Sequence, residues 1–231
     1  MSQASTESKI TQFIHQYSKP ELFEEIPLLV SKAFKEADVD CRARILNCST
    51  RQNRKRSQDR YFYTQEALCS AASGWKPSTQ LTDNKGESYT QLETKNLLAT
   101  LHVLPWFDGK IRRAKSRDKN AALNEGIAEQ LELLLEEESK SKKQKAFEKL
   151  NILIVAVAPQ PDQQQDEPAQ IQVYVPHESN KGYHLKINID DLIAGFATAQ
   201  PITETEDQAW PKLRKQMRKS EEEGSQGEQN E

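Results

Sequence analysis

The feature that most constrains this fold is a series of three apolar runs between residues 151 and 189. The first run, residues 152–157, is unbroken and rich in β-branched side chains, which pack well on the pleated surface of a sheet. A continuous apolar run of strand length indicates a strand whose two faces are both covered. The sequence therefore predicts that residues 152–157 form the central strand of a small sheet.

The next two runs alternate apolar with polar side chains, as half-buried strands do. The inward-facing side chains predicted for these strands are Ile171, Val173 and Val175, and then Tyr183, Leu185, Ile187 and Ile189. Residues 176–182 join the two strands through polar side chains and a glycine, which favours an antiparallel hairpin. Asp190 or Asp191 then caps a short helix that lies back on the sheet.

Most of the remaining chain shows the three- and four-residue apolar spacing of helices. Residues 10–17 form a short helix, Ser18 caps a second one, and residues 59–73 and 90–104 form two more, separated by a polar loop. Residues 41–48 fit either a strand or a helix. From Ala121 the apolar spacing predicts a long helix that links the front half to the sheet.

These elements predict an α+β protein: a helical N-terminal half, a long linking helix, a small three-stranded, mainly antiparallel sheet with a short following helix, and a disordered C-terminal tail. Residues 1–120 are the mainly helical basic region, and residues 121–200 hold the long helix, the sheet and the short helix. We expect these two ranges to pack as one unit. Residues 201–231 are a charged, partly disordered tail.

Composition bounds the class of protein. Of 231 residues, 35% are hydrophobic and 29% charged, so a modest core with polar loops is expected. Cys41, Cys48 and Cys69 lack paired spacing, which predicts reduced thiols in a cytoplasmic protein without a secretory signal. No apolar run approaches the roughly 20 residues that a membrane span needs, so we expect a soluble protein with no membrane partner.

Charge is divided unevenly along the chain. Residues 1–120 hold 20 Lys and Arg against 14 Asp and Glu, a net charge of +6, whereas residues 121–231 hold 12 against 21, a net charge of −9. A positive half suggests an anionic partner. Attraction between the two halves of the chain accounts for the division equally well.

The sharpest functional indication is a first basic block directly followed by aromatic residues. Its predicted nucleic-acid-binding residues are Arg51, Arg54, Lys55, Arg56, Arg60, Tyr61 and Tyr63. Guanidinium groups pair with phosphates and tyrosine rings stack on unpaired bases, so this mixture suits nucleic acid. The alternative is an exposed basic face whose aromatic residues belong to the core of the next helix.

A second basic block follows at Lys110, Arg112, Arg113, Lys115 and Arg117. Such runs are often solvated loops, and they are also common in patches that bind nucleic acid or acidic partners. Two blocks in one net-positive half favour binding more strongly than either block alone. The sequence leaves open whether the two blocks share a face.

Two further segments suggest a protein partner. Trp210, Leu213 and Met217 recur on one side of a basic segment and suit docking to a partner. The leucines of residues 123–134 fit packing on the sheet, or a short coiled coil between copies of the chain, although they span few heptads. These segments support an alternative function, a structural or adaptor subunit of a larger protein assembly.

Signatures of catalysis and of cofactors are missing from the sequence. The eight glycines form no phosphate-binding loop, and no cysteine has the local pattern of a catalytic thiol. His177 and His184 flank the hairpin loop and can approach each other, but no cysteine or carboxylate completes the set, so no metal and no cofactor is predicted. A nuclease using Asp190, Asp191 and Lys186 would need carboxylates from different elements to converge.

We therefore expect a non-enzymatic accessory or regulatory protein associated with DNA or RNA. The two basic blocks contact the phosphate backbone in this hypothesis. Phosphate contacts position a protein on nucleic acid without specifying a sequence, so no sequence-specific base recognition is expected.

Overall fold

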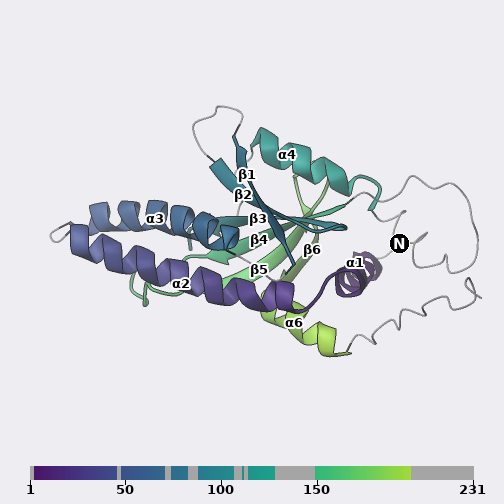
Figure 1. Ribbon diagram of the computed structural model, residues 1–231, viewed down its shortest axis with the longest axis horizontal. Coiled ribbons are helices and arrows are strands. Elements are labelled where there is room, and N and C mark those ends of the chain that lie inside the picture. Colours follow the sequence, from purple (N-terminus) through teal and green to yellow (C-terminus); the bar gives the residue numbers. More distant parts are fainter. Residues whose placement is uncertain are drawn as a thin grey trace, which may run out of the picture. The chain divides into compact units, whose positions relative to one another are not determined.

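A computed structural model describes residues 3–45, 48–70, 74–82, 88–106, 111, 114–127 and 149–198 (Figure 1). The helices are α1 (Gln3–Tyr17), α2 (Glu21–Arg44), α3 (Ser49–Cys69), α4 (Lys115–Ala121), a 3-10 turn (Ala122–Asn124) and α6 (Ile189–Thr198). The strands are β1 (Lys76–Leu81), β2 (Ser88–Glu93), β3 (Leu97–Leu104), β4 (Leu150–Val157), β5 (Gln170–Pro176) and β6 (Tyr183–Asn188). None of the helices in these ranges has the length and apolar character to span a bilayer.

The fold is built on a six-stranded sheet whose strands lie side by side in chain order, from β1 to β6 (Figure 1). Neighbouring strands are antiparallel except β3 and β4, which are parallel. A parallel pair needs a long crossover, here residues 105–149, which include α4. The mixed helix-and-sheet class is confirmed. The predicted three-stranded sheet is wrong, because β1, β2 and β3 continue it beyond β4.

β4 lies in the middle of the sheet and is covered on both faces, as its unbroken apolar run predicted. Ile152 and Ile154 belong to the larger core, whereas Leu153 and Val155 belong to a smaller core on the opposite face. All four side chains are at most 2% exposed. The alternation of strand side chains between the two faces accounts for this division.

Helices cover the two faces unequally. Ile14 of α1, Phe23 and Phe34 of α2, and Leu192 of α6 are fully buried in the larger core. At one end of β4 and β5, the turn after α4 is tied to both strands through Asn124, whose Nδ2 donates to the carbonyl oxygens of Asn151 (3.1 Å) and Pro176 (2.8 Å). The peptide N–H of Asn151 donates in return to Asn124 Oδ1 at 2.9 Å.

The prediction of a helical N-terminal half holds as far as α3 and is wrong after it. The sequence predicts a polar loop and a helix over most of residues 76–104, which instead form β1, β2 and β3. Thr94 makes the tight turn between β2 and β3, because its N–H donates to Leu97 O (2.9 Å) and its Oγ1 accepts from the N–H of Leu97 (3.0 Å). The largely apolar run of residues 97–104 fits a buried strand as well as a helix.

The predicted long helix does not start as a continuous helix at Ala121. α4 ends at that residue, the 3-10 turn follows, and Gly126 adopts a φ of 69°. This left-handed conformation is readily adopted by glycine and is incompatible with an α-helix. Residues 128–148, where the rest of the predicted helix would lie, are outside the described residues.

The β5–β6 hairpin and the helix after it match the prediction, with two corrections. The strand register shifts at Val175 and Pro176, so Tyr183 packs with the smaller core, whereas the sequence predicts that it faces inward with Leu185. A shift of one residue moves a side chain to the opposite face of a sheet. The cap of α6 comes from Asn188, whose Oδ1 accepts from the N–H of Asp190 at 3.3 Å.

Candidate functional site

The first basic block lies within α3, which begins at Ser49 and not at the predicted Asp59. Helical geometry divides the block into two rows of side chains. The inner row, Arg56 and Arg60, is buried together with Thr64 and Leu68, which follow at four-residue spacing. The outer row, Arg51 and Arg54, is exposed, together with Gln58 and Phe62.

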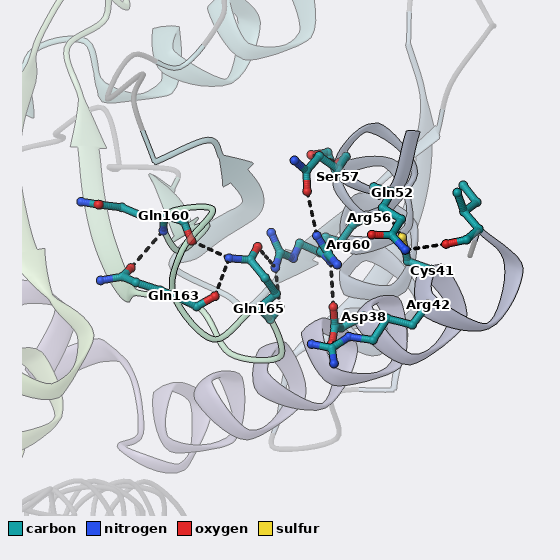
Figure 2. A network of polar contacts seen from close by, with 12 residues as sticks. Asp38, Cys41, Arg42, Gln52, Arg56, Ser57, Arg60, Gln160, Gln163 and Gln165 are labelled. Atoms are coloured by element: carbon teal, nitrogen blue, oxygen red, sulfur yellow. Dashed lines mark hydrogen bonds and ion pairs between the residues drawn. The ribbon is translucent and has the colours of Figure 1, made fainter. Parts of the chain in front are cut away.

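Arg56 is bound to partners inside the protein (Figure 2). Its Nε donates to Asp38 Oδ1 at 2.8 Å, and the side chains of this pair are only 8% and 6% exposed. A second hydrogen bond runs from Arg56 Nη1 to Asn53 Oδ1 at 2.9 Å. The other carboxylate oxygen of Asp38 accepts from Arg42 Nε at 2.8 Å. Arg56 therefore joins α3 to α2 and is not accessible to a polymer.

Arg60 holds the loop between β4 and β5 (Figure 2). Its Nη2 donates to the backbone carbonyl of Gln165 and to Gln165 Oε1, the latter at 3.2 Å. Its guanidinium carbon lies 4.6 Å from the ring centroid of Phe34, in a cation–π contact. Burial, with the neighbouring charge of Arg56, lowers the pKa of Arg60 to about 10. Arg60 stays charged at neutral pH and stabilises the fold.

The polar groups of the other three predicted contacts are also bonded within the chain. Lys55 pairs with the carboxylate of Asp59. The hydroxyl of Tyr61 donates to the carbonyl of Ser88 at 2.9 Å. The hydroxyl of Tyr63 donates to Asp40 Oδ2 at 2.6 Å, which raises the pKa of Tyr63 because ionisation would break the hydrogen bond. The outer row is thus the part of the block whose charged groups are exposed and can contact another molecule.

The exposed side of α3 combines cations with an aromatic ring. Arg51 and Arg54 have no ion-pair partner among the described residues. Phe62 is 60% exposed, and its ring lies 5.5 Å from that of Tyr61 in an edge-on arrangement. A large apolar side chain this exposed on a helix otherwise rich in charge is available for contact with another molecule.

The second basic block is described only in part. Lys110, Arg112 and Arg113 lie outside the described residues, whereas Lys115 is exposed in the first turn of α4. Arg117 is half-buried, and its pKa is lowered by burial and raised in part by Tyr61, Asp118, Tyr183 and Tyr89. Within the described ranges, its Nε has no hydrogen-bond partner.

Arg117 of the second basic block lies near a residue of the first block. Tyr61 is in α3 and Arg117 is in α4, and the two are close enough for Tyr61 to affect the pKa of Arg117. The guanidinium therefore sits near tyrosines from three different elements, α3, β2 and β6. Arg117 of the second block therefore lies near Tyr61 of the first block.

The predicted partner-docking residues, Trp210, Leu213 and Met217, lie outside the described residues. So do the leucines of residues 131–134. Of the same predicted stripe, Leu123 is half-buried and Ile127 is 1% exposed and part of the larger core. Ile127 thus packs within the chain.

The residues considered for a nuclease are dispersed. Asp190 and Asp191 are exposed in the first turn of α6. Lys186 extends over the rings of Tyr174 and Tyr183, with its Nζ 4.8 and 4.6 Å from their centroids. The lysine is therefore engaged with aromatic rings on the sheet face.

Elsewhere, the hairpin loop brings three groups together that could bind a metal ion. Among the described residues, His177, Glu178 and His184 are the one such group, with ligand atoms within 4.8 Å of one another. The carboxylate missing from the predicted pair is supplied by Glu178, which directly follows His177 in the sequence. Burial and His177 lower the pKa of His184, against an opposing effect of Glu178.

Comparisons with known proteins add no assignment: no protein-family model, no curated protein and no solved structure matches this chain.

Proposed function

We propose that this protein is a non-enzymatic, nucleic-acid-associated accessory or regulatory protein that binds the phosphate backbone through the outer side of α3 and through α4. The contact residues are Arg51 and Arg54 with Phe62 on α3, and Lys115 and Arg117 on α4. The observation that carries the proposal is the outer row of α3, where two exposed arginines, with no counterion among the described residues, lie on the same side as an aromatic ring.

The chemistry of these side chains suits a phosphate polymer. Guanidinium groups donate paired hydrogen bonds to phosphate oxygens, and they remain charged at any physiological pH. An exposed phenyl ring offers a surface on which an unpaired base can stack, worth about 1–3 kcal/mol per base. Arg117 supplies a further cation near Tyr61, whose ring contacts that of Phe62 on α3.

The proposal should be tested with substitutions in the outer row of α3 and not in the inner row. Arg56 and Arg60 are buried, so their removal would disturb folding and would not report on binding. Arg51 and Arg54 are exposed, so changing both to alanine removes two charges from the surface only. Loss of two phosphate contacts should weaken binding at least about tenfold at low salt.

The experiment is binding of the full-length protein to labelled single- and double-stranded DNA and RNA over a series of salt concentrations. We expect affinity to fall steeply with salt, and the slope against log salt to decrease by about 2 in the Arg51→Ala/Arg54→Ala variant, since each phosphate contact contributes about 0.9. The tightest-bound polymer identifies the partner class.

A matched control is available on α2. Lys32 and Lys35 have the same three-residue spacing and lie outside both basic blocks. Lys32→Ala/Lys35→Ala removes the same charge and should leave affinity and slope nearly unchanged. Equal losses in both double variants would indicate a general charge effect, and absence of binding at low salt would reject the proposal. An interaction with a protein that tolerates salt would favour the adaptor alternative.

A further inference from the structure

The hairpin loop between β5 and β6 is closed by its own backbone. The N–H of His177 donates to Gly182 O at 2.9 Å, and the N–H of Asn180 donates to His177 O at 2.8 Å. Asn180 adopts a left-handed φ of 55°, which asparagine tolerates better than most residues. These bonds fix the chain at His177 and bring it back toward His184 on the opposite strand.

The two imidazoles point their nitrogens at each other. His177 Nδ1 lies 3.2 Å from His184 Nε2, and the rings meet edge to face with centroids 4.0 Å apart. Glu178 places a carboxylate oxygen 3.9 Å from the same His184 nitrogen, and its side chain is 51% exposed. Three potential ligand atoms from two strand ends therefore surround one point.

We propose that His177, Glu178 and His184 bind one Zn²⁺ ion at the tip of the β5–β6 hairpin. Zinc in proteins is bound by histidine nitrogen at about 2.0–2.1 Å and by carboxylate oxygen at about 2.0–2.2 Å. Two nitrogens on a tetrahedral zinc are then about 3.3 Å apart. This separation is close to the 3.2 Å between His177 Nδ1 and His184 Nε2. To bind the ion, the two imidazoles give up their mutual hydrogen bond and turn both nitrogens toward it, and the exposed Glu178 carboxylate swings inward as the third ligand. Water completes the fourth position.

The ligand set favours zinc over the hard cations. Imidazole nitrogen suits zinc, copper and nickel, whereas magnesium and calcium take oxygen ligands. A site with two imidazoles and a single carboxylate therefore offers too few oxygens for magnesium or calcium. The site shares no residue with the surface proposed for nucleic acid, since His177 and Glu178 follow β5 and His184 lies on β6.

Gly182 is required for this arrangement. A Cβ added at this residue would lie 2.7 Å from His177 Cδ2, which is too close for carbon atoms. Any larger residue would displace the His177 ring from its present position. The glycine does not have a left-handed φ, so its role is to leave room for the ring.

The loop also connects to α4. Asn180 Nδ2 donates to Asp118 Oδ1 at 2.9 Å, and Asp118 adjoins Arg117. A zinc ion that ties His177 to His184 would hold the turn in which Asn180 lies. Zinc should therefore raise the melting temperature and slow hydrogen exchange both in the hairpin and in α4.

The test measures zinc binding to the full-length protein, purified without a histidine tag and stripped with a chelator. Titration against a chromogenic zinc indicator should show one Zn²⁺ per chain, and Mg²⁺ at millimolar concentration should not compete. Co²⁺ gives a second readout, since its visible spectrum reports coordination by nitrogen and oxygen ligands. His177→Gln and His184→Gln should each weaken binding by about 100-fold or more, because even an outer-shell partner contributes 10- to 100-fold.

Three matched variants distinguish zinc binding at the hairpin from zinc binding elsewhere on the chain. His15→Gln removes a histidine whose Nε2 contacts Leu192 O and should leave zinc binding intact. Cys48→Ser/Cys69→Ser removes the two thiols that are not buried and should also leave it intact. Gly182→Ala removes no ligand atom, yet should weaken binding through displacement of His177, with the variant's melting curve verifying its fold.

Two results would overturn the proposal. The first is the absence of stoichiometric zinc binding to the unmodified protein, which would leave the imidazoles as a simple hydrogen-bonded pair. The second is zinc binding that survives His177→Gln and His184→Gln, whether or not the cysteine variant then loses it.

Discussion

Both rows of α3 carry arginines, and these arginines lie in opposite environments. Arg56 and Arg60 in the inner row are buried and bonded to Asp38 and Gln165, so they hold helices and a loop together. Arg51 and Arg54 in the outer row are exposed. The difference means that an arginine-rich segment should not be treated as a single binding surface, because the arginines of one row are already bonded within the fold.

The largest effect that would test this comparison comes from removing Asp38. Asp38→Ala should destabilise the protein by about 3–5 kcal/mol, since it leaves the buried Arg56 guanidinium without its counterion. Equilibrium unfolding in urea, followed by circular dichroism, measures the change. Glu36→Ala is the control: its pair with Lys32 is 4.0 Å apart and solvent-exposed, so its loss should cost less than about 1 kcal/mol.

A double variant sharpens the same test. Replacing both members of the buried pair, as in Asp38→Leu/Arg56→Met, should recover most of the stability lost in Asp38→Ala, because no unpaired charge remains. A loss below about 1 kcal/mol in Asp38→Ala would mean that water reaches Arg56, and the inner row would then not differ from the outer row.

Local sequence patterns predicted the C-terminal part of the sheet well and missed its other half. β4, β5 and β6 were evident because a buried strand is continuously apolar and half-buried strands alternate. β1 had no such signal: its side chains are almost all exposed, and Pro77 is compatible with its place at the sheet edge. Leu97 and Leu101 satisfy helical spacing, so the apolar residues of β3 gave no decisive period.

The helical period of the sequence is sufficient to divide the basic block into a buried row and an exposed row. Arg56, Arg60, Thr64 and Leu68 recur every four residues, and Leu68 marks that side as buried. The identities of the partners could not have been found, because Asp38 is 18 residues from Arg56 and Gln165 is 105 residues from Arg60. Such contacts follow from the tertiary fold alone.

A half-buried, neutral side chain, His102, completes the comparison. His102 lies on β3, with its Nε2 3.1 Å from Thr100 Oγ1. Burial first, and the charge of Arg117 second, lower the pKa of His102 to about 3. Where Arg56 is buried and charged beside a carboxylate, His102 is half-buried and neutral near another cation.

This difference predicts a dependence of stability on pH. Between about pH 6.5 and pH 3 the unfolded His102 binds a proton that the folded one does not, so stability falls as the pH is lowered through this range. At pH 5 the loss from this residue should be at most about 2 kcal/mol, and less where solvent reaches the ring. Urea unfolding at pH 7.5 and pH 5 measures it.

His102→Gln is the matched variant, since glutamine does not titrate and can keep the hydrogen bond to Thr100. The stability of the unmodified protein should fall more between the two pH values than that of the variant. Parallel losses in the two proteins would show that His102 accepts a proton in the folded state, and that its partial burial does not exclude charge.

The smallest expected effect is on the outer row itself. Arg51→Ala/Arg54→Ala should change the free energy of unfolding by less than about 0.5 kcal/mol, because both side chains are exposed and alanine favours a helix at least as well as arginine. Urea unfolding of this variant beside Asp38→Ala provides the direct contrast between the rows. A loss above about 1 kcal/mol would show that the outer arginines contribute to the fold. Weaker nucleic-acid binding by that variant could then no longer be assigned to lost phosphate contacts, so the stability measurement should precede the binding measurement.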